Sequence, residues 1–106
     1  MKLKRMHNPA HPGEIIKANY IEGAGLSVAK LAEILDVHPS KLRRIVNDSS
    51  RVTAEMAMRL SKAFGTSADT WLNMQRNYDI WIASQKVDLS NVRKLKLPRS
   101  YRDAED

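Results

Sequence analysis

The apolar residues of this chain recur with the period of an α-helix over its first 86 residues, and this periodicity limits the possible fold more than any other feature. The stretch 54–64 shows it most clearly, because its apolar side chains fall at positions i, i+1, i+4, i+7 and i+8, which share one helical face. We find no convincing alternation of the kind that marks a β-strand in these residues. The pattern therefore predicts an all-α fold of five helices joined by short loops.

Capping residues set the expected bounds of these helices. Pro12 and Glu14 suit a first helical turn, so the first helix is expected from His11 to about Glu22, where glycines follow. Serine, threonine and proline begin the other helices, and Gly65 ends one of them. The expected helices are 11–22, 28–35 after Ser27, 40–47 after Pro39, 54–64 after Thr53, and 68–86 after Ser67.

The chain is expected to have three parts. Its 106 residues suffice for one domain with a modest core. Residues 1–10 are a basic arm, 11–86 form the helical domain, and 87–106 are a C-terminal extension. The mixed charges and Pro98 of the extension predict a short ordered piece near 89–97, followed by a frayed polar end.

The composition excludes several classes of protein. The chain has no cysteine, which removes disulfides, thiolate zinc sites and cysteine catalysis. No apolar run approaches the roughly 20 residues that span a bilayer, and no apolar signal-peptide stretch follows the basic start. We therefore expect a cytoplasmic protein with no membrane partner. Its net charge of +6 suits a polyanionic partner such as nucleic acid.

Residues 27–47 have the features of two short helices that cross at a tight turn. Ala32 is small enough for close crossing, and Asp36 tolerates the unusual backbone dihedrals of the turn, although glycine does so better. Apolar residues are spaced to clamp the two helices together. They are Leu31, Leu35, Val37, Leu42 and Ile45. This segment therefore predicts a helix-turn-helix.

The second helix of the pair presents a cationic face. With Leu42, Ile45 and Val46 turned inward, the opposite side carries Ser40, Arg44 and Asn47, flanked by Lys41 and Arg43. Arginine can bind guanine through two hydrogen bonds, and lysine and serine can bind phosphates or base edges. A merely solvated face is the alternative, but the preceding turn and clamp favour DNA binding. Arg51, just after this helix, is expected to hold the adjacent DNA backbone.

Four segments resemble the HigA antitoxins, also known as the virulence-associated protein I type, a branch of the phage-repressor-like helix-turn-helix group. They are 6–14, 26–33, 53–60 and 64–81, and the strings Met-Ala-x-Arg-Leu (56–60) and Trp-Leu-Asn-x-Gln (71–75) are the most specific. The resemblance implies a five-helix, lambda-repressor-like fold. It also implies binding to a palindromic operator in the gene's own promoter, and neutralisation of a small messenger-RNA-cleaving toxin encoded beside it.

By position, the resemblance carries the family's reading-helix residues over to His38, Ser40, Lys41, Arg43 and Arg44. The chain departs from the family where His38 replaces a capping serine or threonine, where Asp36 and Asp48 replace glycines, and where Gly23-Ala24 replaces a Pro-Leu pair. These changes leave the apolar clamp intact. The full set of candidate DNA-binding residues is Ser27, His38, Pro39, Ser40, Lys41, Arg43, Arg44, Asn47 and Arg51.

The helix expected over 68–86 offers a surface for a second copy. One recognition helix covers few base pairs, so a homodimer is expected. The helix has two apolar faces, and one is enough to close a small core. The first is Trp71, Met74, Tyr78, Trp81 and Ile82. The second, Leu72, Ile80 and Ala83, is therefore predicted to meet a second copy or a toxin.

Other functions fit the sequence less well. His7, His11 and Glu14 have a spacing that metal ligands can show, but the histidines flank Pro9 and so do not share a helical face. No catalytic string is found, and we expect no enzyme, catalytic residue, cofactor or metal. Two functions stay open, an autoregulating antitoxin and a stand-alone transcriptional regulator without a toxin. A pure protein-interaction module is a third, less favoured class.

Overall fold

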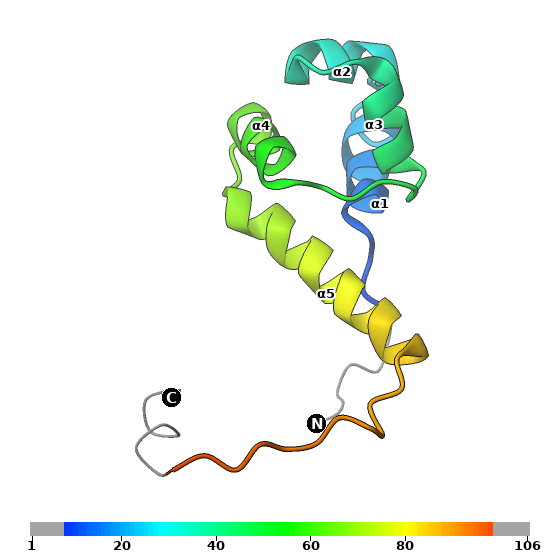
Figure 1. Cartoon of the computed structure of the whole chain (residues 1–106). Coiled ribbons are helices and arrows are strands. Elements are labelled where there is room, and N and C mark those ends of the chain that lie inside the picture. The colour runs from blue at the N-terminus through cyan, green and yellow to red at the C-terminus, as the bar shows by residue number, and fades with distance from the viewer. Residues whose placement is uncertain (1–7, 99–106) are drawn as a thin grey trace.

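The computed structural model describes residues 8–98, and within this range all regular secondary structure is helical (Figure 1). The five predicted helices are confirmed. The predicted basic arm lies outside the described residues up to His7, and so does the predicted frayed end from residue 99. The helices are α1 (Pro12–Ile16), continued by the π-helix η1 (Lys17–Glu22), then α2 (Val28–Leu35), α3 (Pro39–Val46), α4 (Ala54–Phe64) and α5 (Ala68–Lys86).

The predicted capping residues begin their helices as expected. The hydroxyls of Ser27, Thr53 and Ser67 accept hydrogen bonds from backbone N–H groups three residues later, at 3.0, 3.2 and 3.1 Å. Two histidines cap their helices through a ring nitrogen, which accepts from the N–H two residues later. His11 Nδ1 accepts from Gly13 at 2.9 Å, and His38 Nδ1 accepts from Ser40 at 3.1 Å. His38 therefore still caps its helix, although it replaces the family's serine or threonine.

The first helix differs from the prediction in its second half, which is a π-helix. The N–H of Gly23 donates to the carbonyl of Ala18 at 2.8 Å. This hydrogen bond joins residues five positions apart, as in a π-helix, and not four apart as in an α-helix. A Cβ at position 23 would lie only 2.7 Å from the carbonyl oxygen of Asn19, so this tight closing turn requires glycine. The helix therefore widens before it ends, and Gly25 then adopts a left-handed conformation with φ of 78°.

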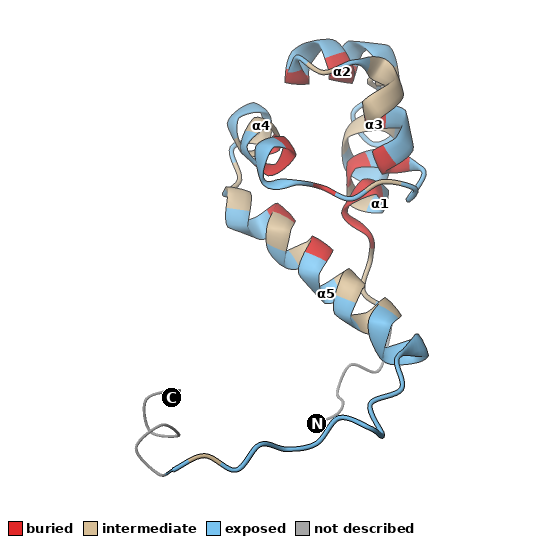
Figure 2. Ribbon diagram, viewed as in Figure 1, coloured by how far each residue is buried: buried red, intermediate tan, exposed pale blue. Residues whose placement is uncertain are grey.

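One core joins α1 to the helix-turn-helix, to α4 and to the first half of α5 (Figure 2). Helices α1 and α3 approach each other closely, because a Cβ on Gly13 would lie 1.9 Å from the carbonyl oxygen of Ile45. Glycine at this position therefore lets α3 pack directly on α1. The buried apolar residues are Ile16, Leu31, Ala32, Leu35, Leu42, Ile45, Val46, Val52, Met56, Ala57, Leu60 and Trp71.

The second half of α5 extends away from the other helices (Figure 1). Of the first apolar face predicted on this helix, Trp71 and Met74 pack in or against the core, whereas Trp81 and Ile82 are half-buried and lie outside it. The expectation that one full face closes the core is therefore wrong for these two residues, because the core ends before α5 does. None of the helices in the described part is long and apolar enough to cross a membrane.

The segment 87–98 forms no helix or strand within the described residues. Near 89–97, where a short ordered piece is predicted, the structure has one turn, in which the N–H of Val92 donates to the carbonyl of Leu89 at 3.0 Å. No residue of this segment belongs to the core. Four large aliphatic side chains are exposed here, namely Val87, Leu89, Val92 and Leu95.

Candidate nucleic-acid interface

Helices α2 and α3 form the predicted helix-turn-helix. Ala32 is fully buried at the crossing, and Asp36 adopts the left-handed conformation that the turn needs, with φ of 58° and ψ of 48°. Four of the five predicted clamp residues are buried, and Val37 is half-buried against the core. The chain thus crosses two short helices at a tight turn that contains no glycine.

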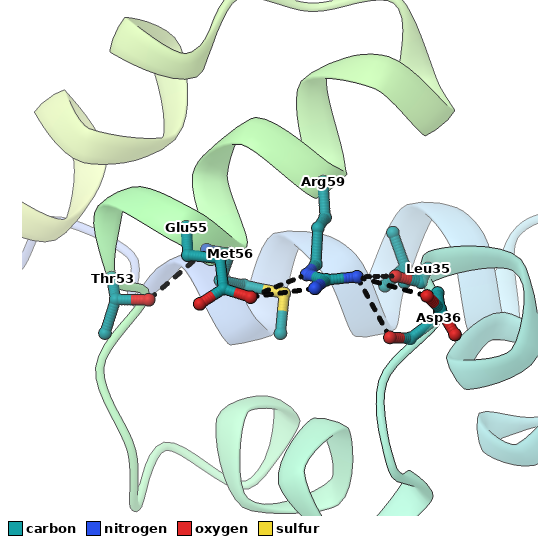
Figure 3. Close-up of polar contacts among 6 residues, drawn as sticks. All are labelled: Leu35, Asp36, Thr53, Glu55, Met56 and Arg59. Atoms are coloured by element: carbon teal, nitrogen blue, oxygen red, sulfur yellow. Dashed lines mark hydrogen bonds and ion pairs between the residues drawn. The ribbon is translucent and has the colours of Figure 1, made fainter.

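Arg59 of α4 holds this turn in place (Figure 3). Its guanidinium donates hydrogen bonds to the backbone carbonyls of Leu35, at 3.0 Å, and Asp36, at 2.9 Å. These carbonyls lie at the end of α2, where helical partners are missing. Glu55, one turn earlier on α4, accepts from Arg59 at 2.8 Å and fixes its orientation. Arg59 belongs to the family string 56–60, but nothing in the spacing of residues indicates this contact.

The pKa values of Glu55 and Arg59 are both shifted in the directions that favour their charged forms. Hydrogen bonds from Arg59, together with its charge and that of Lys41, hold the pKa of Glu55 below its usual range. The same pairing with Glu55 raises the pKa of Arg59. Glu55 of α4 is therefore held as a carboxylate next to the turn that Arg59 fixes.

Most of the predicted outer face of α3 is open to solvent. Arg43, Arg44 and Asn47 are exposed, whereas Ser40 and Lys41, in the first turn, are half-buried. Leu42, Ile45 and Val46 face the core, with 7% exposure or less. Two arginines and an amide therefore stand on a helix whose opposite side is fixed by packing.

Four more predicted DNA-binding residues lie at the N-terminal ends of α2 and α3. At the start of α3, His38 is exposed and Pro39 is half-buried, and the hydroxyl of Ser40 lies 2.8 Å from His38 Nδ1. Ser27 is exposed at the start of α2, where its hydroxyl is already engaged as a cap. Backbone N–H groups at helix starts favour anions such as phosphate, which agrees with a contact to the DNA backbone.

Arg51, in the loop after α3, has an acidic partner on α5. Its Nε donates to Asp79 Oδ2 at 3.1 Å, and its Nη2 makes a second contact with the same oxygen. Burial would raise the pKa of Asp79, but hydrogen bonds from Arg51 and Gln75 outweigh this effect and hold the pKa below its usual range.

Gln75, the last residue of the family string 71–75, is a buried polar residue whose contacts were not expected from the sequence. It is 1% exposed, and its Oε1 accepts from the N–H of Val52 at 2.8 Å while its Nε2 donates to Asp79 Oδ1 at 3.0 Å. A buried amide is tolerated only when it is hydrogen-bonded. The spacing of Gln75 and Asp79, one helical turn apart, was the available signal, but it does not reveal a partner 23 residues earlier.

The loop after α3 also meets the start of α1. Asp48 adopts a left-handed conformation, with φ of 64°, and its carboxylate lies 3.3 Å from His11 Nδ1. Burial and the nearby Asp48 raise the pKa of Glu14. The ring of His11 packs edge-on against Tyr78, with centroids 4.9 Å apart. His11 is therefore a buried helix cap. The described residues contain no group of three side chains that could hold a metal ion. His7, the other histidine with metal-ligand spacing, lies outside the described residues.

The second predicted face of α5 is only partly free. Ile80 is 49% exposed and Ala83 is exposed, whereas Leu72 is half-buried against the chain's own core. The predicted dimer or partner surface therefore centres on the second half of α5.

Comparisons with known proteins agree with this geometry. The family model "Helix-turn-helix" matches residues 18–71. Virulence-associated protein I of Dichelobacter nodosus is 43% identical over 82 residues, which cover 77% of this chain and 76% of that protein.

Two solved structures are also similar. The antitoxin GraA in complex with its operator has a TM-score of 0.80 and 33% identity, covering 91% of this chain and 100% of that one. The Pseudomonas aeruginosa antitoxin HigA with the higBA promoter has a TM-score of 0.74 and 32% identity, covering 85% and 100%.

Proposed function

Because the chain belongs to the phage-repressor-like helix-turn-helix family, in the group of virulence-associated protein I and the HigA antitoxins, we propose that it binds operator DNA in its own promoter. It does so as a homodimer and represses transcription. The same protein is the antitoxin of a toxin–antitoxin pair and neutralises its cognate toxin by stoichiometric binding.

The observation that carries this proposal is the outer face of α3. Its arginines are exposed on a helix that packing fixes from behind and that Arg59 fixes at the turn. Such a helix can enter the major groove, where arginine binds guanine O6 and N7. Two similar proteins were solved on operator or promoter DNA, which supports the same use of the fold.

We assign roles within the DNA-binding domain, residues 11–86, as follows. Arg44 and Arg43 bind base edges, and Lys41 and Arg51 bind phosphates. Ser27, His38, Pro39 and Ser40 place the two helix starts against the backbone, and Asn47 contacts DNA beyond the end of α3. Arg51 makes its contact while it is paired with Asp79.

The partner surface lies on α5. A dimer buries Ile80 and Ala83, with Leu72 at the edge of the contact, and this arrangement sets two copies of α3 about one DNA turn (~34–36 Å) apart. The N-terminal arm, residues 1–10, and the C-terminal extension, residues 87–106, flank this domain.

The protein acts by binding and not by catalysis. Its family consists of DNA-binding regulators and antitoxins, and the proposal needs no cofactor or metal. A DNA partner places the protein in the cytoplasm, with no membrane partner.

A gel-shift experiment with the DNA upstream of the gene tests both activities. The purified protein should shift this DNA at a specificity ratio of about a thousandfold or more over unrelated DNA. The product of a neighbouring reading frame should form a stoichiometric complex with the protein and change the shift. Growth arrest by that product, relieved by co-expression of this chain, completes the test.

The possible outcomes separate the candidate functions. A DNA shift with no toxic neighbour would leave a stand-alone regulator. Neutralisation without any DNA shift would leave a pure interaction module. A protein that does neither overturns the proposal.

A further inference from the structure

The loop after α3 is tied to α5 by a chain of hydrogen bonds. The N–H of Val52 donates to Gln75, Gln75 donates to Asp79, and Asp79 accepts from the guanidinium of Arg51. Val52 and Gln75 are each 1% exposed, whereas the side chain of Arg51 is 64% exposed. The chain of bonds therefore begins in the core and ends at an exposed cation in the loop that follows the recognition helix.

We propose that Asp79, itself held by Gln75, is a positioning residue that presents Arg51 to a phosphate of bound DNA. This inference rests on the proposed function and assigns a DNA-binding role to α5, the helix that also carries the dimer surface.

The geometry of the guanidinium supports this role. Arginine has five N–H donors in a rigid plane. Asp79 uses Nε and Nη2, while Nη1 has no hydrogen-bond partner among residues 8–98. A carboxylate on one edge of the plane leaves the other edge for a phosphate. An arginine held in this way loses less rotamer entropy on binding than one on a free side chain.

The backbone next to Arg51 is fixed as well. Val52 is buried, and its N–H donates to Oε1 of Gln75 at 2.8 Å. The backbone next to Arg51 therefore cannot move without breaking a buried hydrogen bond. Two anchors from α5 thus hold one residue, through its side chain and through the adjacent backbone.

The charge of Asp79 provides a sharp test, because two explanations predict opposite signs. If Asp79 acts only through its negative charge, it repels DNA, and its removal should tighten binding. If Asp79 positions Arg51, its removal should weaken binding.

The experiment compares Asp79→Ala with Glu33→Ala in the full chain, using fluorescence anisotropy with the gene's upstream DNA. Glu33 is an exposed carboxylate on α2, and its Oε1 lies 3.7 Å from Nζ of Lys30. Replacing Glu33 by alanine therefore removes one negative charge, as Asp79→Ala does, but leaves the contacts of Arg51 unchanged. We expect Asp79→Ala to raise the Kd roughly three- to fivefold, the range of a partly exposed charge pair. Glu33→Ala should leave the Kd unchanged or lower it.

Two further variants isolate the role of Arg51. Arg51→Ala should weaken binding and lower the salt slope by about one, the share of one phosphate contact. Adding Asp79→Ala to Arg51→Ala should then cause no further loss, and Asp79→Glu should recover part of the wild-type affinity. Thermal melts of every variant confirm that the fold is kept.

Unchanged or tighter binding by a folded Asp79→Ala variant overturns this inference and leaves the proposed function standing. A further loss on top of Arg51→Ala also overturns it, because Asp79 would then act on another group. A wild-type protein that does not bind the upstream DNA overturns the proposed function, and this inference with it.

Discussion

Helices α3 and α5 bury their side chains in different ways. Over eight residues α3 buries Leu42, Ile45 and Val46, whereas α5 buries only Trp71 and Gln75 over nineteen. The orientation of α3 is therefore determined within one chain, as a rigid recognition element requires. The second half of α5 leaves apolar side chains uncovered, which is expected of a helix that meets a partner.

The first prediction tests this contrast through stability. Leu42→Ala should lower the free energy of unfolding by about 2–5 kcal/mol, because the side chain is fully buried and leaves a cavity. Ile80→Ala should cost less than about 1 kcal/mol, because Ile80 is 49% exposed. Urea unfolding at low protein concentration, where dimer formation contributes least, measures both. Equal losses would contradict the contrast between the two helices.

The second prediction concerns the proposed dimer surface of α5. Ile80→Asp combined with Ala83→Asp should weaken self-association at least about a hundredfold, because four like charges would meet in a symmetric interface. Leu72 is left unchanged, since it packs partly on the chain's own core. Sedimentation velocity measures the dissociation constant.

A second exposed apolar pair serves as the control. Ile34 and Met58, which are 49% and 65% exposed, line a groove between α2 and α4. Ile34→Asp with Met58→Asp should leave the dimer intact. If this pair dissociates the dimer and the α5 pair does not, the interface lies in the groove and not on α5.

The third prediction separates base recognition from phosphate binding on α3. Arg44→Ala should cost about 1–3 kcal/mol of operator binding and relax the preference at one base position. Lys41→Ala should weaken binding to all sequences and lower the salt slope by about one. Anisotropy titrations with single-base operator variants at several salt concentrations distinguish the two. Uniform weakening by Arg44→Ala would contradict its assignment to a base.

The same contrast explains which parts of the molecule were predictable from sequence. Periodicity and capping predicted five helices because both are local, and the exposed side of α3 followed from its buried stripe. The contacts of Arg59 with the α2 carbonyls and of Gln75 with Val52 were not predictable, since each joins residues 23 or 24 positions apart through a polar group. Periodicity also overestimated the core contribution of α5, because it cannot tell where the neighbouring helices end.

The fourth prediction concerns the turn between α2 and α3. Asp36→Gly should raise the free energy of unfolding by about 0.5–1 kcal/mol, because glycine adopts the observed φ of 58° without steric cost. Losing the exposed carboxylate should cost little, since it lies 3.8 Å from Arg59 in a surface ion pair. Asp36→Ala is the matched control and should destabilise the fold. Equal effects of glycine and alanine would show that the backbone conformation is not the cause.

The smallest expected effects concern two carboxylates that face the loop after α3, Asp79 of α5 and Glu14 of α1, and that respond to pH with opposite signs. The lowered pKa of Asp79 means that its stabilising contribution is present above its ordinary value of 3.8 and is lost as pH falls through the folded-state pKa. Asp79→Asn should therefore be less stable than wild type near neutral pH, and the difference in the free energy of unfolding should disappear in acid.

The raised pKa of Glu14 predicts the opposite pH dependence. The folded state favours the protonated form of Glu14 below 4.5, and this stabilisation is lost as pH rises through the folded-state pKa. Glu14→Gln should thus be slightly more stable than wild type near neutral pH and equal to it in acid. Urea unfolding from pH 3 to pH 7 follows both differences; two differences of the same sign would show that the loop is not held between α1 and α5 as described.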